Sequence, residues 1–279
     1  MCRETMQAIQ YVKSIPRYLT VRLVGKHFGG VYTSGVSCVR LAEIDEPKPL
    51  TPQWVKFRTR LSGICGSDLA TITAKGSPYF SPFTSCPFVL GHEVVGEIAG
   101  AGAEGDGYAA GDRVIIEPVL SCAIRGIEAP CHQCQRGHFA NCENITRGNI
   151  SAGIQTGYCR DTGGGWSQYF VAHQNQLHHV PDGLSDEIAV LAEPFACALH
   201  SVLKADIRGT DEVLIIGAGT IGLLTVAAIR SLGRLNRILI VAKYPHQQKL
   251  ARELGANEII PGDKDLYPNF CRLTGAESY

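Results

Sequence analysis

The sequence has no charge imbalance and no long hydrophobic run. Its 26 basic and 26 acidic side chains give a formal net charge of zero, so electrostatics offers no argument for a nucleic-acid or anionic-membrane partner. No segment approaches the roughly 18 consecutive apolar residues of a membrane span. Residues 1–18 also lack the continuous apolar core of a secretory signal. We therefore expect a cytoplasmic protein.

Cysteine, by contrast, is abundant, with 11 residues in a chain of 279. In a chain of this length without an export signal, metal binding or catalysis explains cysteine better than a disulfide framework does. Most of the cysteines are scattered, but Cys131, Cys134 and Cys142 form a cluster. This spacing points to a metal site.

The chain divides into two regions that differ in their predicted secondary structure. Residues 1–200 contain short β-like runs separated by Gly and Pro, which predicts an all-β domain without a long amphipathic helix before residue 185. Ser185 is placed to cap that helix, and Pro194 should break or kink it. Residues 201–279 alternate strands with helices, which predicts a parallel α/β sheet.

A glycine motif, G-x-G-x-x-G, occupies residues 217–222. It follows the apolar strand 213–216 and opens a helix, which is the context that a dinucleotide-binding motif requires. The glycines allow the tight turn, the close approach of a pyrophosphate and the packing of helix on strand, while the helix N-terminus offers free N–H groups. The alternative is a glycine-rich turn that binds no nucleotide. The expected cofactor residues here are Gly217, Gly219, Thr220, Ile221 and Gly222.

The end of the second strand of this region carries no acidic residue for the adenosine ribose. Val241 is followed by Ala242, Lys243 and Tyr244. Lys243 can meet a 2′-phosphate as a point charge, which favours NADP over NAD. A solvated loop lysine is the competing interpretation.

Two further segments carry residues that suit a catalytic zinc ion. "GICGSDL" holds Cys65, and "GHEVVGEI" holds His92 and Glu93. Thiolate and imidazole are both zinc ligands, and Glu193 is a third candidate. Neighbouring side chains of a strand point to opposite faces, so His92 and Glu93 can approach one ion only where the strand ends. Alone, each residue has an ordinary structural explanation; the combination predicts a site.

These motifs, together with "GDRV", the cysteine cluster, "AEPFACALHSV" and "GAGTIG", occur in an order that resembles the zinc-dependent medium-chain alcohol dehydrogenase family. The resemblance covers nearly the whole chain and is greatest to the branch of polyol, threonine and glucose dehydrogenases. It implies a GroES-like catalytic domain (residues 1–200) and a Rossmann, doubly wound parallel-sheet domain (201–279). It further implies hydride transfer between a primary or secondary alcohol of polyol, sugar or hydroxy-amino acid type and NAD(P).

The resemblance also assigns roles in the catalytic site. Cys65 and His92 match two zinc ligands, Glu93 matches a carboxylate that can coordinate the ion conditionally, and Glu193 matches a position that binds the zinc or its water. Small-molecule alcohols are the expected partners, and relatives suggest a homodimer or homotetramer.

Two residues of "GICGSDL" support the proposed ligands. Asp68 is expected to hold the His92 ring and fix its tautomer, or to cap a helix, or both. Ser67 is expected to carry the substrate proton outward. Some family members continue this relay through a histidine, near a place where this chain has Ala70.

The cysteine cluster resembles the family's structural-zinc lobe, expected near residues 117–145. The family pattern has a fourth cysteine three residues before Cys131, but this chain has Glu128 there. Cys122 lies further back and is the first choice for the fourth ligand. Glu128 is the alternative, because carboxylates also bind zinc.

The chain departs from the family at its end. From Val213 to Tyr279 it holds only the first half of a dinucleotide fold, so we expect a C-terminally truncated chain. A catalytically silent, zinc-binding fragment or subunit is therefore the second hypothesis. A zinc-free quinone reductase of the same superfamily is a third, and it conflicts with the presence of Cys65, His92 and Glu193.

Overall fold

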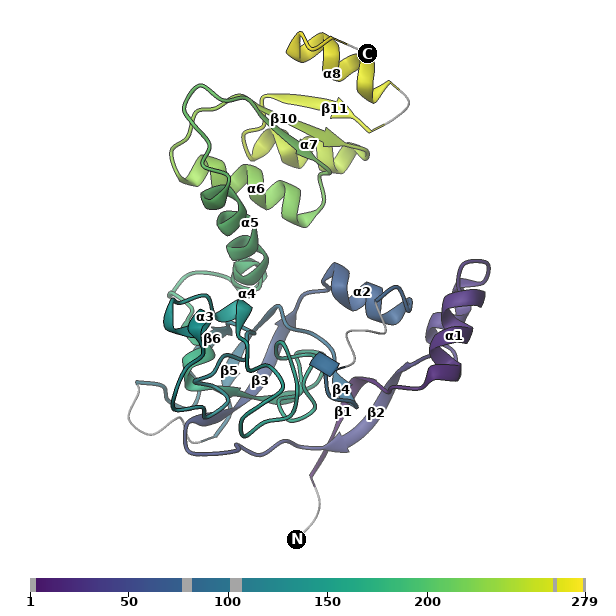
Figure 1. Cartoon of the computed structure of the whole chain (residues 1–279), viewed down its shortest axis with the longest axis vertical. Coiled ribbons are helices and arrows are strands. Elements are labelled where there is room, and N and C mark those ends of the chain that lie inside the picture. The colour runs from purple at the N-terminus through teal and green to yellow at the C-terminus, as the bar shows by residue number, and fades with distance from the viewer. Residues whose placement is uncertain (1–3, 77–81, 101–106, 263–264, 278–279) are drawn as a thin grey trace. The chain divides into compact units, whose positions relative to one another are not determined.

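The computed structural model describes residues 4–76, 82–100, 107–262 and 265–277. The chain forms two compact units, Met1–Leu191 and Ala192–Tyr279 (Figure 1). The ten described cysteines are all free thiols. Within the described ranges, no helix combines the length and the apolar character needed to cross a membrane.

The first unit is built mainly of strands. Its strands are β1 (Thr5–Tyr11), β2 (Val39–Asp45), β3 (Trp54–Ser62), β4 (Phe88–Val89), β5 (Val94–Ile98), β6 (Arg113–Ile116), β7 (Tyr169–His173) and β8 (Leu177–His179). Its helices are α1 (Ile15–Val24), α2 (Gly66–Ile72), α3 (His132–Gln135) and α4 (Asp186–Ala189), with 3-10 turns η1 (Gly29–Thr33), η3 (Phe139–Asn141) and η4 (Gln174–Gln176).

Two antiparallel sheets form this unit, one in the order β2-β1-β4 and the other in the order β7-β3-β5-β6-β8. The larger sheet buries one apolar cluster that includes Phe57, Val94, Ile98 and Phe170. Half-buried and buried positions alternate along β6, as a strand with one face in the core requires, whereas β3 is buried mainly in its first half. The expected strands are present, but the unit also contains helices α1 to α4, so it is mainly rather than entirely β.

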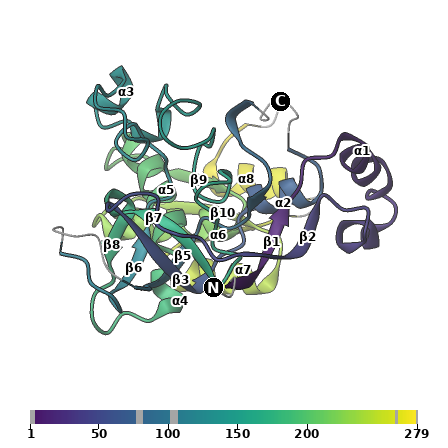
Figure 2. The same ribbon diagram turned by 90° about the horizontal axis from the view of Figure 1, so that it is seen from below.

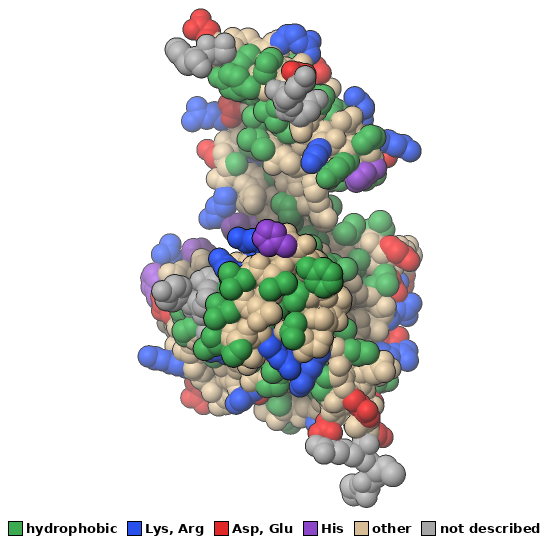
Figure 3. Space-filling view, turned by 90° about the vertical axis from the view of Figure 1, so that its right-hand side faces the viewer, with side chains coloured by type: hydrophobic (Ala, Val, Ile, Leu, Met, Phe, Trp, Pro, Cys, Tyr) green, Lys and Arg blue, Asp and Glu red, His purple; other side chains and the backbone are tan. Residues whose placement is uncertain are grey.

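Helix α1 was not expected. It occupies the connection between β1 and β2, beside α2 (Figures 1 and 2). Pro16 lies in its first turn, where a missing N–H costs nothing, so this proline starts the helix rather than preventing it. Ile15 and Leu23 are exposed, so the helix lacks the polar outer face that marks an amphipathic pattern. Figure 3 shows hydrophobic side chains open to solvent on the face of the unit that carries α1.

The predicted break near Pro194 is present as two helices. Helix α4 ends at Ala189, and α5 (Ala192–Lys204) begins two residues before the proline. Pro194 thus lies in the first turn of α5, where backbone N–H groups have no partner within the helix. Ser185 takes the N-cap position of α4, but its side chain makes no capping hydrogen bond, contrary to expectation.

The second unit is a three-stranded parallel sheet in the order β11-β10-β9. Its further elements are β9 (Val213–Ile216), α6 (Thr220–Ser231), β10 (Ile238–Ala242), α7 (Pro245–Glu253), β11 (Glu258–Pro261) and α8 (Leu266–Thr274). Ile238 and Ile240 pack toward the helices α5, α6 and α7, whereas Leu239 and Val241 pack toward α8. Helices therefore cover both faces, as the doubly wound expectation required. Gly255 follows α7 with a φ of +102°, a left-handed conformation that glycine commonly adopts after a helix.

Candidate active site and metal centres

Three ligand atoms converge at the junction of β3, α2 and β5. Cys65 is the N-cap residue of α2, and His92 and Glu93 lie in the turn just before β5. The Cys65 sulfur, a His92 ring nitrogen and a Glu93 carboxylate oxygen all lie within 4.8 Å of one another. Because the two neighbours lie ahead of the strand, its alternation does not separate them. His92 is buried, and the other two are half-buried.

Glycine at position 63 makes room for Glu93. The Gly63 N–H donates to the Glu93 carbonyl at 2.8 Å. A Cβ at position 63 would overlap the Glu93 carboxylate. The first glycine of "GICGSDL" therefore lets this carboxylate lie against the backbone beside Cys65.

Asp68 both caps α2 and faces His92. Its Oδ2 accepts the Cys65 N–H at 2.9 Å, and its Oδ1 lies 3.7 Å from His92 Nδ1. Burial raises the pKa of Asp68, while His92 and the backbone N–H groups of Cys65 and Gly91 act in the opposite direction. This arrangement turns the Asp68 carboxylate toward one side of the His92 ring and leaves the other nitrogen for a ligand.

The Cys65 thiol lies in surroundings that favour its ionised form. Its pKa is below the usual value, chiefly because of a hydrogen bond to His92, and Ser67 adds to this through side chain and backbone. Ser67 in turn shares a hydrogen bond with the hydroxyl of Tyr158. That hydroxyl is also 3.2 Å from Thr71 Oγ1. Burial raises the pKa of Tyr158, so its hydroxyl keeps its proton.

A cavity of about 670 Å³ opens beside these groups within the first unit. Cys65, Ser67 and His92 belong to its wall, as do Tyr158 and Ala70. Tyr158 belongs to none of the sequence motifs described above. It lies in an irregular segment between the cysteine lobe and β7, and no periodicity or spacing in the sequence marks it.

The four cysteines of the predicted lobe come together. The sulfurs of Cys122, Cys131, Cys134 and Cys142 all lie within 4.8 Å of one another, and Glu128 is not part of this group. Cys122 Sγ and Cys142 Sγ are 3.6 Å apart. This is close to the edge of about 3.8 Å of a tetrahedron with zinc–sulfur bonds of about 2.3 Å. The thiols therefore fit a closed zinc site.

Backbone and side-chain N–H groups point at these sulfurs. Cys131 N–H and the Asn144 amide donate to Cys122 Sγ at 3.4 and 3.3 Å. Glu143 N–H donates to Cys131 Sγ at 3.4 Å. The backbone N–H groups of Cys134 and Glu143 lower the pKa of Cys131 to about 6. Such donors stabilise thiolate charge, which is the form that binds metal.

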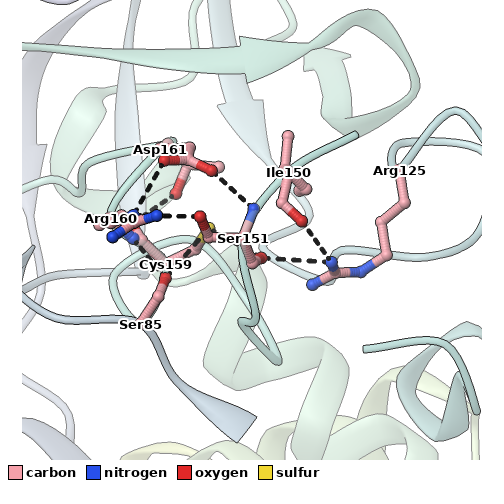
Figure 4. A network of polar contacts seen from close by, with 8 residues as sticks. Ser85, Arg125, Ile150, Ser151, Cys159, Arg160 and Asp161 are labelled. Carbon is pink, nitrogen blue, oxygen red and sulfur yellow. Dashed lines mark hydrogen bonds and ion pairs between the residues drawn. The ribbon is translucent and has the colours of Figure 1, made fainter. Parts of the chain in front are cut away.

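Arg125 organises the same lobe from inside. Its side chain is fully buried and donates to the backbone carbonyls of residues 120, 147, 150, 151 and 153. Figure 4 shows two of these bonds, to Ile150 and Ser151, and the adjoining pair of Arg160 and Asp161. Burial lowers the pKa of Arg125, while nearby Cys159, Cys142 and Cys122 act to raise it. A buried positive charge thus lies near the cysteine sulfurs.

The glycine turn has the predicted local geometry. Gly217 follows β9 with a φ of +102°, and Gly219 is the N-cap residue of α6. A Cβ at Gly222 would overlap the Gly217 carbonyl, so this glycine lets helix and turn pack closely. A Cβ at Gly219 would meet no atom within 4 Å, so the backbone there is open to an approaching group. Thr220 and Ile221 form the exposed first turn of α6.

Lys243, predicted to contact the cofactor, and Glu193, predicted to bind zinc, both lie in the second unit. Lys243 follows β10, is exposed, and its Nζ lies 5.3 Å from the centre of the Tyr244 ring. Glu193 lies in the first turn of α5, and its carboxylate accepts a long hydrogen bond from the Cys197 thiol at 3.6 Å. A part for Glu193 at the zinc site stays a prediction.

Comparison with known proteins shows what this chain is similar to. Residues 51–182 match the alcohol dehydrogenase GroES-like domain. The chain is 32% identical over 235 residues to (R,R)-butanediol dehydrogenase of Bacillus subtilis and 32% identical over 218 residues to L-threonine 3-dehydrogenase of Pectobacterium carotovorum. These matches cover 81 and 78% of the chain but 61 and 58% of the relatives. The chain thus spans about 60% of their length.

A solved structure is also similar. Acetophenone reductase of Geotrichum candidum, in complex with NAD, is 25% identical and superposes with a TM-score of 0.68. The match covers 93% of the chain and 64% of that protein.

Proposed function

The chain belongs to the zinc-dependent medium-chain alcohol dehydrogenase family, and from this premise we propose that it serves in zinc-dependent hydride transfer between an alcohol and NAD or NADP. The observation that supports this most is the convergence of Cys65, His92 and Glu93, of which Cys65 and His92 line a cavity. One sulfur, one nitrogen and one oxygen donor suit a catalytic zinc ion. Glu193 is the further ligand that the family resemblance suggests.

A zinc ion held there would polarise the substrate hydroxyl as a Lewis acid. The side chains around it have separate tasks. Asp68 orients the His92 ring, and Gly63 leaves space for the Glu93 carboxylate. Ser67 takes the hydroxyl proton and is held in place by Tyr158. The alcohol is oriented by the cavity wall.

The cysteine lobe would hold a second, structural zinc ion through Cys122, Cys131, Cys134 and Cys142. A closed set of four thiolates leaves no open position for substrate. The proposal therefore gives the lobe a structural task only.

The dinucleotide is proposed to bind at the turn of Gly217, Gly219 and Gly222 and at the first N–H groups of α6, which include those of Thr220 and Ile221. Lys243 favours NADP, because its ammonium group can pair with a 2′-phosphate. We also propose a cytoplasmic location, as the sequence led us to expect, and a homodimer or homotetramer for the full-length protein, as the family resemblance implies.

The relatives leave the substrate open, since their names include a diol, a hydroxy-amino acid and an aromatic ketone. The test is the reduction of NAD and NADP by a panel of alcohols, followed by absorbance of the reduced cofactor. Wild type and Cys65→Ala are compared, with Cys271→Ala as control, because Cys271 lies on α8 outside both metal-binding groups. We expect turnover that Cys65→Ala abolishes and Cys271→Ala retains. Bound zinc without any turnover would instead favour a catalytically silent zinc-binding chain.

A further inference from the structure

Helix α1 forms one wall of the cavity beside the proposed zinc ligands. Ile15, Tyr18 and Leu19 all line it. Their spacing of three and four residues places them on one face of the helix. The connection between β1 and β2 thus turns an apolar face of a helix toward the place where an alcohol would bind.

This wall is fixed to the rest of the site. Val21 packs with Val31 and Ala74 in a small core, with Tyr18 and Tyr32 against it. The Tyr18 hydroxyl donates to the Gly76 carbonyl at 2.8 Å, and Arg22 donates to the Ala74 carbonyl at 2.9 Å. Residues 74 and 76 directly follow α2, the helix that carries Ser67. Helix α1 is therefore held at a set position relative to the reacting groups.

Four aromatic side chains, those of Tyr11, Tyr18, Phe88 and Tyr158, belong to the cavity wall. Phe88 lies between Tyr11 and Tyr158, with ring centres 5.0 and 5.2 Å away. No carboxylate belongs to the described residues of the wall, and its polar side chains include those of Lys13, Ser14, Thr71, Thr84 and Gln155. A polyol hydroxyl that lies against the apolar part of this wall without a partner would lose its hydrogen bonds to water. A ring would gain from the same contacts.

The size of the cavity supports a larger substrate than a four-carbon diol. Cavities of about 300–1000 Å³ typically enclose drug-sized ligands, and this one measures about 670 Å³. We propose that the cavity takes an alcohol carrying an aromatic ring and that α1, through Leu19, determines this specificity. The inference rests on the proposed function for the reaction: the carbinol C–H bond breaks, hydride passes to NAD(P)⁺, the hydroxyl proton leaves, and C=O forms.

Three substrates with the same reacting CH(OH)–CH₃ group provide the test. Propan-2-ol, butane-2,3-diol and 1-phenylethanol differ only in the group that occupies the cavity. For the zinc-loaded chain with NAD and NADP, we expect kcat/KM for 1-phenylethanol to exceed that for the diol by about a hundredfold. A preference for the diol would overturn the inference and leave the proposed function intact.

A matched pair of variants locates the specificity on α1. Leu19→Trp fills the cavity, whereas Leu23→Trp adds the same ring on the same helix at a position that is 70% exposed and outside the wall. We expect Leu19→Trp to lower kcat/KM for 1-phenylethanol at least about tenfold and that for propan-2-ol less than about twofold. Leu23→Trp should change neither. Equal losses for both substrates in Leu19→Trp would contradict a specificity role.

A second readout does not depend on turnover. Saturation-transfer NMR on the zinc-loaded chain should show contact to the ring protons of 1-phenylethanol, reduced by Leu19→Trp but not by Leu23→Trp. This result without turnover of any alcohol would support the aromatic site and refute the dehydrogenase proposal. Absence of ring contact in wild type would overturn the inference, whatever the enzyme turns over.

Discussion

Replacement of Arg125 by methionine should destabilise the first unit strongly. The side chain is 0% exposed and donates to five backbone carbonyls. The bonds to Leu120, Ile150 and Gly153 are buried, and methionine leaves these carbonyls without a donor. At about 1–3 kcal/mol for each, the loss is large, and relief from burying a charge offsets part of it. We expect a decrease of about 3–5 kcal/mol in the free energy of unfolding.

The assay follows this unit alone. Both tryptophans of the chain, Trp54 and Trp166, lie in the first unit, so their fluorescence reports its unfolding. At roughly 2–4 °C for each kcal/mol, the midpoint should fall by about 6–20 °C. The control is Arg160→Met in the same network, where an exposed side chain pairs with Asp161 at 3.5 Å. It should cost less than about 1 kcal/mol. Equal midpoints for the two variants would refute the proposed role of Arg125.

Three further predictions concern the site and the lobe. Gly63→Ala should displace the Glu93 carboxylate and weaken zinc binding at Cys65 by about tenfold or more, measured by competition with a chelator, because the added Cβ overlaps that carboxylate. After zinc removal, Cys131 should react with iodoacetamide at a rate that rises through a midpoint near pH 6, because its folded-state pKa is lowered to about 6 and the thiolate is the reactive form. Tyr158→Phe should lower kcat by about tenfold and the unfolding free energy by only about 1 kcal/mol, because the ring packing remains but Ser67 loses its partner.

Each of these predictions has a control or a contrary result. Gly35→Ala is the match for Gly63→Ala, because a Cβ there meets no atom within 4 Å; equal zinc affinities in the two variants would contradict the steric argument. If alkylation of Cys131 instead began only near pH 9, the N–H groups would not stabilise its thiolate. If Tyr158→Phe left kcat unchanged, the hydroxyl would have no part in positioning Ser67.

Local rules predicted the second unit well. The strand Val213–Ile216 matches β9, and the glycine turn has the expected positive φ and close packing. Such features depend on a few neighbouring residues, so a single sequence contains them. Helix α8 was nevertheless not expected. It packs on Leu239 and Val241, on the sheet face opposite α6 and α7.

In the first unit, several features depend on contacts between residues far apart in the sequence, which local sequence patterns do not predict. Cys122 lies nine positions before Cys131, outside the usual spacing, and only the folded loop brings its sulfur to the others. Tyr158 meets Ser67 across about ninety residues of chain, a contact that no local spacing encodes. Helix α1 was not predicted, because Pro16 resembles a helix-breaking residue and because the apolar side chains of the helix lie on both of its faces. Long-range packing, rather than periodicity, determines all three.

The most direct test of a zinc site at Cys65, His92 and Glu93 is the zinc content of the chain by elemental analysis. Wild type should bind two zinc ions per chain, and Cys65→Ala should bind one. Cys131→Ala should also lose one, from the lobe. One zinc in wild type that Cys65→Ala leaves unchanged would mean that only the lobe is filled, and it would contradict the catalytic site proposed for this chain.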